Sequence, residues 1–192
     1  MLAVFRADAS PALGGGHVMR CLTLADALAE KGWQCGFACN AGATDIVPAV
    51  LGYDLLEVPN GADAVPSMRE SWPGPWELAV VDHYGLDSAF ENQLRAAAGR
   101  ILVIDDLHDR KHDCDFLLDQ TYGRTAAEYE ELIPKGARTL LGPDYALLRP
   151  EFASLREDAL KKREQRGGRI NMLVSFGATD PHNLSGLALE AL

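Results

Sequence analysis

The sequence contains little cysteine, and none of it has the spacing of a metal or redox motif. The four cysteines are Cys21, Cys35, Cys39 and Cys114, and no two of them form a CxxC pair. Each lies in an apolar stretch, where a reduced and buried thiol is at home. The cysteines therefore indicate free thiols and a reducing compartment.

Long apolar runs are also absent. No stretch reaches the roughly 18 apolar residues that span a bilayer. Arg6 and Asp8 interrupt the apolar start of the chain at once, so it lacks the pattern of a secretory signal. Together with the free thiols, this predicts a cytoplasmic protein without a membrane segment.

Positive charge is scarce. The chain has 18 Lys and Arg against 28 Asp and Glu, a formal net charge of −10. This balance repels phosphate backbones and anionic membranes, so neither nucleic acid nor a membrane is an expected partner. The densest basic run, residues 161–163, lies among acidic residues and is typical of a solvated helix face. The oligomeric state stays open.

The sequence does contain a regular alternation of short apolar runs with helical patterns. The predicted strands are residues 2–5, 35–39, 55–58, 78–81, 101–104, 116–118, 139–141 and 172–174. Strands that alternate with helices form a parallel sheet covered on both faces. The predicted fold class is therefore α/β, a Rossmann-like sheet with helices on both faces.

The clearest predicted helix begins near His17. Its apolar stripe has helical spacing, and Gly32 follows as a stop signal. The stripe comprises Val18, Cys21, Leu22, Ala25, Leu28 and Ala29. His17 and Arg20 are expected on the opposite side of the first turn.

Two prolines, Pro143 and Pro150, bracket a predicted domain boundary. We expect an amino-terminal domain over residues 1–150 and a linker helix with a Gly-Gly hinge over 151–168. Residues 169–192 have the pattern of a strand, a turn at Gly177 and a helix opened by Asp180 or Pro181. That helix needs a sheet to bury its apolar face, so we expect it to begin a second, truncated nucleotide-binding α/β domain.

A glycine-rich loop joins the first predicted strand to the first helix. Gly14, Gly15 and Gly16 leave backbone N–H groups open at the helix start, which suits a phosphate or sugar diphosphate. The loop is neither a GxGxxG dinucleotide fingerprint nor a P-loop. It can also be a turn that merely lets strand and helix pack.

His17 follows this loop directly. The unperturbed pKa of imidazole is about 6.5 and the positive end of a helix lowers it, so the neutral form needed by a general base is expected at neutral pH. The alternative is an exposed histidine, or one that hydrogen-bonds to its own loop.

Acidic residues and histidines cluster after two further strands, at Asp82-His83-Tyr84 and at Asp105, Asp106, His108 and His112. They can form a metal site, since Asp and His bind Mg²⁺, Mn²⁺ or Zn²⁺. Neither HxH nor HExxH spacing occurs, and strand-end aspartates also cap helices or orient neighbouring backbone. Tyr84 can contact a sugar or simply pack.

Six segments together carry a family resemblance. They are Phe-Arg-Ala-Asp at 5–8 with Gly-Gly-Gly-His-Val-Met-Arg at 14–20, Val-Asp-His-Tyr-Gly at 81–85, Ile-Asp-Asp at 104–106, Cys-Asp at 114–115, Gly-Pro-Asp-Tyr-Ala-Leu-Leu-Arg at 142–149 and Ser-Phe-Gly-Ala-Thr-Asp at 175–180. The chain resembles, over its full length, the hydrolases of bacterial pseudaminic acid biosynthesis that cleave UDP-2,4-diacetamido-2,4,6-trideoxy-β-L-altropyranose.

The resemblance implies a two-domain glycosyltransferase-B-like fold with its active site in the interdomain cleft. It implies that His17 activates water and that neither a metal nor another cofactor is needed. The expected partner is a small-molecule UDP-sugar. The candidate ligand contacts are Arg6, Asp8, Gly14, Gly15, Gly16, Arg20, Asp82, His83, Tyr84, Asp106, Tyr145, Arg149, Gly177 and Thr179. Tyr145 and Arg149 are expected on one face of a helical turn.

Two other functions stay open, and a third is disfavoured. A glycosyltransferase of the same fold would pass the sugar to an acceptor instead of water. A non-catalytic module would bind a nucleotide-sugar without turnover. A nicotinamide oxidoreductase is disfavoured, because Asn40 and not an acidic residue ends the second strand.

Overall fold

The computed structural model describes residues 1–59, 64–165, 167–168, 170–177 and 179–192. Arg169 and Ala178, which belong to the predicted second domain at residues 169–192, lie outside the described residues. The chain divides into two compact units, Met1–Leu147 and Leu148–Leu192. None of the helices in the described part of the chain is long and apolar enough to cross a bilayer.

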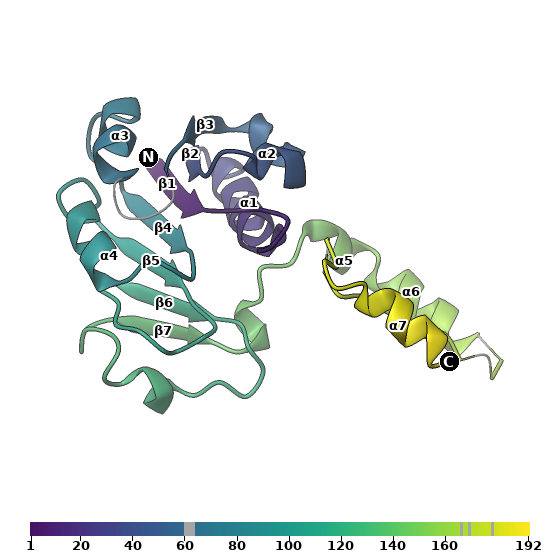
Figure 1. The fold of residues 1–192 in the computed structure, drawn as a ribbon. Coiled ribbons are helices and arrows are strands. Elements are labelled where there is room, and N and C mark those ends of the chain that lie inside the picture. Colours follow the sequence, from purple (N-terminus) through teal and green to yellow (C-terminus); the bar gives the residue numbers. More distant parts are fainter. Residues whose placement is uncertain (60–63, 166, 169, 178) are drawn as a thin grey trace. The chain divides into compact units, whose positions relative to one another are not determined.

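The first unit is built on one parallel sheet (Figure 1). Its strands are β1 (Leu2–Ala7), β2 (Gln34–Cys39), β3 (Asp54–Glu57), β4 (Leu78–Asp82), β5 (Ile101–Ile104), β6 (Phe116–Asp119) and β7 (Arg138–Leu141). The described strands follow the order β3-β2-β1-β4-β5-β6-β7, and all neighbours pair in parallel. This confirms the predicted Rossmann-like α/β fold, with its change of direction between β1 and β4.

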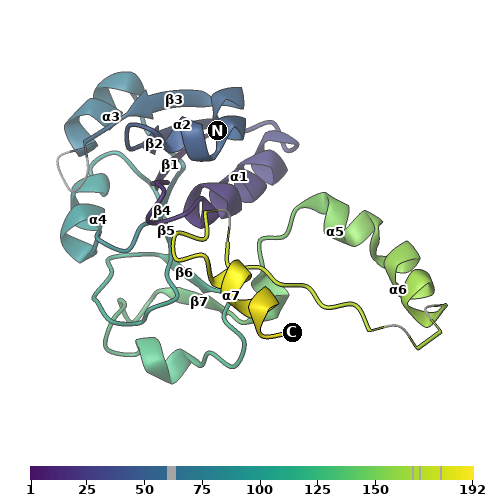
Figure 2. The same cartoon turned by 45° about the vertical axis from the view of Figure 1, so that its right-hand side comes forward.

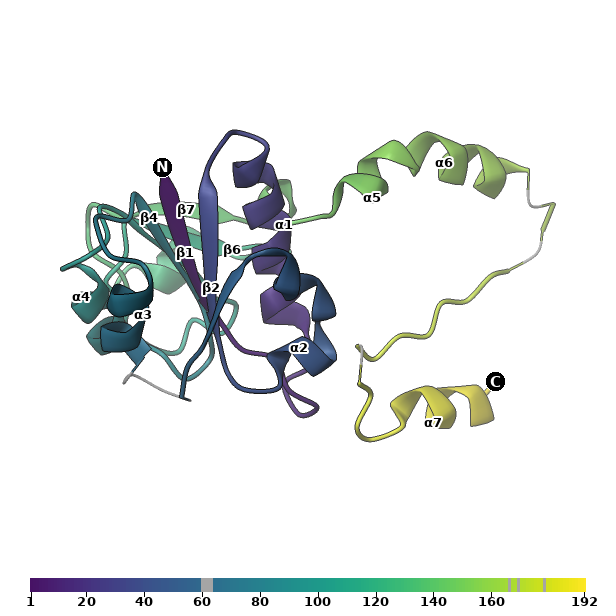
Figure 3. The same ribbon diagram turned by 90° about the horizontal axis from the view of Figure 1, so that it is seen from above.

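Helices cover both faces of the sheet (Figure 3). They are α1 (Gly16–Ala29), α2 (Ala43–Ile46), α3 (Val65–Ser71) and α4 (Ser88–Leu94), with short 3-10 turns at Pro48–Gly52, Ala126–Tyr129 and Pro143–Tyr145. α1 lies against β1, β2 and β4 (Figure 2). Phe5 and Val18 pack in the core on the α1 side, whereas Val4 and Phe90 pack in the core on the α4 side. Alternate residues of a strand thus bury opposite faces, as a two-sided sheet requires.

α1 begins one residue before the predicted start. It ends near Gly32, whose φ of +81° is the left-handed conformation that glycine adopts readily. The buried stripe contains Val18, Cys21 and Ala25, as predicted, but it also contains His17. His17 was expected on the opposite side; that expectation was wrong, because the first turn of α1 packs against the end of β4.

The second unit contains α5 (Pro150–Ser154), α6 (Arg156–Glu164) and α7 (Leu184–Glu190). The strand predicted at residues 172–174 does not form, since residues 170–176 have no regular structure and no pairing strand. α7 begins later than predicted, and the Asp180 carboxylate accepts the N–H groups of Leu184 and Ser185 at its start. That this unit begins a second domain stays a prediction.

Candidate active site

The candidate site lies at the carboxyl ends of β1 and β4, where the strand order changes direction. Open parallel sheets bind ligands at this point. The loop after β1 is closed by a pair of backbone hydrogen bonds between Ser10 and Gly14, of 3.2 and 2.7 Å. It then enters α1, which no side chain caps. The first amides of α1 therefore have no side-chain acceptor among the described residues, which is the setting in which a helix start binds an anion.

The three glycines of this loop have different surroundings. Gly14 has a φ of +73°, which favours glycine. A Cβ at Gly15 would lie 2.7 Å from Val47 Cγ2, so only glycine fits against this side chain. Gly16 is exposed, and a Cβ there would meet nothing within 4 Å. Two glycines thus shape the turn, and the third leaves its surface open.

His17 and Asp82 form a dyad across 65 residues of sequence, with 2.6 Å between His17 Nδ1 and Asp82 Oδ1. Burial would raise the pKa of the Asp82 carboxyl, but hydrogen bonds from Arg20 and His17 outweigh it and lower that pKa. Asp82 is therefore ionised and accepts the Nδ1 proton, so Nε2 of His17 carries the free lone pair. Within the described residues Nε2 has no hydrogen-bond partner, and it is not sealed from solvent.

Arg20 lies one turn further along α1 and bridges two carboxylates. Its Nη2 donates to Asp82 Oδ1 at 2.6 Å, and its Nη1 donates to Asp106 Oδ2 at 3.1 Å. Arg20 was expected to contact ligand. Two carboxylates neutralise the guanidinium and hold it in place, and its contact with a ligand stays a prediction. Its evident work is to orient Asp82.

Tyr84 covers the other side of His17. The two rings meet edge to face, with centroids 4.4 Å apart and an interplanar angle of 84°. Tyr84 remains 42% exposed, so part of the ring is open to a ligand. Partial burial, and then the nearby negative charge of Asp106, raises the pKa of its hydroxyl.

A second pair joins His83 to Asp8. His83 Nδ1 accepts the Gly85 N–H at 2.8 Å, so Nε2 bears the proton and donates to Asp8 Oδ2 at 3.0 Å. Asp8 also pairs with Arg6 and accepts the Asn40 N–H at 2.8 Å. Arg6 is fully buried. Arg6 holds Asp8 in place, and its role as a ligand contact stays a prediction.

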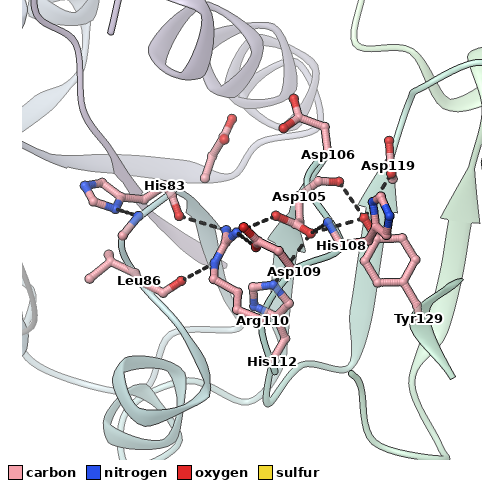
Figure 4. Close-up of polar contacts among 12 residues, drawn as sticks. His83, Leu86, Asp105, Asp106, His108, Asp109, Arg110, His112, Asp119 and Tyr129 are labelled. Atoms are coloured by element: carbon pink, nitrogen blue, oxygen red, sulfur yellow. Dashed lines mark hydrogen bonds and ion pairs between the residues drawn. The ribbon is translucent and has the colours of Figure 1, made fainter. Parts of the chain in front are cut away.

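The adjacent carboxylates Asp105 and Asp106 have separate tasks (Figure 4). Asp105 is buried, accepts hydrogen bonds from His108 N and the Tyr129 hydroxyl, and lies 2.9 Å from Arg110 Nη1. Asp106 is half-buried and pairs with Arg20. The sequence left open whether these carboxylates bind a ligand or orient the neighbouring backbone. The contacts of Asp105 show that it orients the structure around it.

Tyr145 and Arg149 do not share a helical turn, which corrects the sequence expectation. Tyr145 ends the 3-10 turn Pro143–Tyr145, whereas Arg149 belongs to the second unit and has an extended ψ of 146°. Pro150 is the reason, because a residue before proline avoids the helical region. The Arg149 guanidinium lies over the Phe152 ring, 5.7 Å from its centroid.

Gly177 and Thr179 also lie in the second unit, and Gly177 has a φ of +85°. Their role as ligand contacts stays a prediction. No three of the described His, Cys, Asp and Glu side chains gather in an arrangement that could hold a metal ion. At the site edge the described carboxylates pair with arginines and histidines. The expectation of a metal-free reaction stays a prediction.

Three residues that hold this edge together were not predicted from the sequence. Asn40 bonds the backbone of Ala9 in both directions, at 3.0 Å each. Arg110 and Arg124 donate to backbone carbonyls at the ends of β4 and β5. All three lie in loops without periodicity. The only available signal was that lone basic residues occur among aspartates.

The fold and this edge define a class: a Rossmann-like α/β domain with a histidine–carboxylate dyad at its switch point. No protein-family model matches the chain. It is 29% identical over 188 residues to the UDP-2,4-diacetamido-2,4,6-trideoxy-beta-L-altropyranose hydrolase of Campylobacter jejuni, which confirms the resemblance in the motifs. It is also 23% identical over 190 residues to an uncharacterized protein of Methanocaldococcus jannaschii.

The match covers 96% of this chain in both comparisons. It covers 63% of the length of the Campylobacter hydrolase and 38% of the length of the Methanocaldococcus protein. The chain therefore spans less than two thirds of either relative.

Proposed function

We propose that the full-length protein hydrolyses a UDP-activated 2,4-diacetamido-2,4,6-trideoxy sugar at the anomeric carbon and releases UDP with inversion, in pseudaminic acid biosynthesis. The observation that carries the proposal is the His17–Asp82 dyad, whose Nε2 is free beside a partly exposed tyrosine. The similarity to the Campylobacter hydrolase supports the substrate class.

In the proposed reaction, His17 Nε2 takes a proton from water while the water oxygen attacks the anomeric carbon. The new carbon–oxygen bond forms opposite the bond to UDP, and the electrons of that bond leave with the diphosphate oxygen. The imidazole becomes positively charged, and Asp82 stabilises this charge through Nδ1. Arg20 keeps Asp82 ionised and in position.

The open amides at the start of α1 are suited to hold the departing diphosphate, since a helix amino terminus attracts anions. Gly16 has no side chain that would keep the phosphate away. We assign this metal-independent role to the loop at Gly14–Gly16. Tyr84 and Asp106 are the proposed sugar contacts, together with Tyr145, which follows the carboxyl end of β7.

We also propose that a second domain completes the site, as in a glycosyltransferase-B-like fold, and that Gly177 and Thr179 belong to its nucleotide-binding loop. Two cavities of the first unit, of about 560 and 540 Å³, are lined by other residues than those of the site. A second domain over the carboxyl ends of β1 and β4 would shield the reacting sugar from bulk water.

The test is replacement of His17 by Asn or Ala in the full-length protein. We expect turnover to fall at least about a hundredfold, the usual contribution of a general base. UDP binding, measured by calorimetry, should change little because the amides that hold the diphosphate belong to the backbone. Near-normal turnover would remove His17 from the mechanism.

A glycosyltransferase or a non-catalytic binding module would behave differently in the same assay. Release of UDP with no acceptor present favours hydrolysis over transfer. Proton NMR of the product identifies the anomer and tests inversion. Binding without any turnover by the full-length protein would support the non-catalytic module.

A further inference from the structure

Arg110 connects two parts of the sheet edge that are separate in sequence (Figure 4). It lies in the segment between β5 and β6. Its Nε donates to the Leu86 carbonyl at 2.9 Å, and its Nη2 donates to the His83 carbonyl at 3.0 Å. One planar guanidinium thus holds both ends of the loop 83–86.

This loop carries two side chains of the candidate site. Tyr84 packs on the ring of His17, and His83 donates to Asp8. Within the described part of the chain, the other hydrogen bonds of the loop backbone are local, from Gly85 N to His83 Nδ1 and from Leu86 N to the His83 carbonyl. Among the described residues, Arg110 is therefore the side chain that ties the loop backbone to a neighbouring element.

The other side of Arg110 is anchored in the core. Nη1 lies 2.9 Å from Asp105 Oδ1 and donates to Asp109 at 3.0 Å. Asp105 is itself held by the His108 amide and the Tyr129 hydroxyl. The end of β5 is therefore a rigid support for the loop after β4.

We propose that Arg110 is a positioning residue that fixes loop 83–86, and with it Tyr84 against His17 and His83 against Asp8. Its effect on turnover rests on the proposed function. A guanidinium presents several N–H donors in one plane, so it can hold two carbonyls and a carboxylate at once. A lysine keeps the charge opposite Asp105 but cannot reproduce this geometry.

The first test measures hydrogen–deuterium exchange of the loop amides in Arg110→Lys. We expect exchange at residues 83–86 to become at least about tenfold faster, while β1 and β4 keep their protection. The matched control is Arg95→Lys. Arg95 also bonds two carboxylates and a carbonyl, at Asp113 and Asp115, so its replacement should loosen that segment and leave loop 83–86 unchanged. Unchanged loop exchange in Arg110→Lys overturns the proposal.

The second test is a double-mutant cycle on turnover with Tyr84→Ala. If Arg110 acts through Tyr84, Arg110→Lys should lower turnover by roughly tenfold in the parent but by less than about twofold in the Tyr84→Ala background. Equal losses in both backgrounds would mean a general structural role and overturn the proposal.

Failure of the proposed function gives a different result. If the parent protein releases no UDP from any candidate UDP-sugar, the proposed function is wrong, and loop exchange still decides the role of Arg110. If circular dichroism shows that Arg110→Lys is unfolded, a double variant replaces it in both tests. This variant combines Arg110→Gln with Asp105→Asn, so that one positive and one negative charge are removed together.

Discussion

Asp82 determines which nitrogen of His17 can act as a base. Its carboxylate is fully buried, and an ionised carboxylate in that position needs partners. Arg20 and His17 supply them and lower the pKa of Asp82, although burial acts in the opposite direction. The Nδ1 proton of His17 is thereby committed to Asp82, which leaves Nε2 for water.

Replacement of Asp82 by Asn should lower turnover at least about a hundredfold, because an amide cannot stabilise the imidazolium and permits the other tautomer of His17. Steady-state kinetics of the full-length protein measures this. Asp106→Asn is the comparison variant: it removes one bond to Arg20 and a proposed sugar contact but leaves the dyad intact, so we expect a smaller loss, below about tenfold. An Asp82→Asn protein as active as the Asp106→Asn variant would contradict the role of the dyad.

The sequence identified His17 because a histidine that follows three glycines at a helix start has a recognisable setting. It could not predict that Arg6 pairs with Asp8 and that Arg20 pairs with Asp82 and Asp106. Arg20 meets Asp82 across 62 residues, and the tight packing of β1 beside β4 produces that meeting. Whether an arginine is free for a ligand depends on such pairings.

Among the secondary-structure elements, β2 and α3 depend on each other through one glycine. A Cβ at Gly36 of β2 would lie 2.5 Å from Trp72 Cε2. Trp72 directly follows α3 and donates from its indole to Asp54 at 2.6 Å. The indole therefore lies against the bare backbone of the strand.

Gly36→Ala should destabilise the first unit by about 1–3 kcal/mol, because a methyl group there forces Trp72 out of place. Urea unfolding followed by tryptophan fluorescence measures the change. Gly52→Ala serves as control, since a Cβ at Gly52 meets nothing within 4 Å, and its effect should stay within about 0.5 kcal/mol. Equal stability of the two variants would show that the Trp72 contact is not a constraint.

Seven of the eight predicted strands form, and their runs of buried apolar residues explain why. β5 consists of four buried apolar residues, and β1 has a near-continuous buried pattern, as central parallel strands do. The eighth, at residues 172–174, has the same apolar composition but pairs with none of the described strands. Apolar composition predicts a strand, whereas a strand exists only where its backbone can pair.

At the scale of the whole molecule, a buried charge network joins α4 to the end of β5. His112 Nδ1 lies 2.7 Å from Glu91, and His112 Nε2 lies 3.8 Å from Asp105. Burial would lower the pKa of His112, but the two carboxylates outweigh it and raise the pKa to about 9. His112 is therefore charged in the folded protein at neutral pH.

This network predicts how stability depends on pH. Because the folded-state pKa of His112 exceeds the unfolded value of about 6.5, its contribution is fully present below about pH 6.5 and declines toward pH 9. Urea unfolding of the parent between pH 6 and pH 9 should show this loss. His112→Gln should be less stable at pH 6 and nearly flat over the same range. A flat parent curve would contradict a charged His112.

The alternation of strands and helices, the parallel sheet and the glycine loop that leads to His17 follow from the sequence alone, because periodicity and backbone propensity act over a few neighbouring residues. Which charged side chains pair with one another could be decided only from the folded structure. Asp82, Arg20 and Asp106 meet at one edge of the sheet only after distant strands align. An electrostatic partner is chosen by distance in space, and distance in space is set by the packing of the whole sheet.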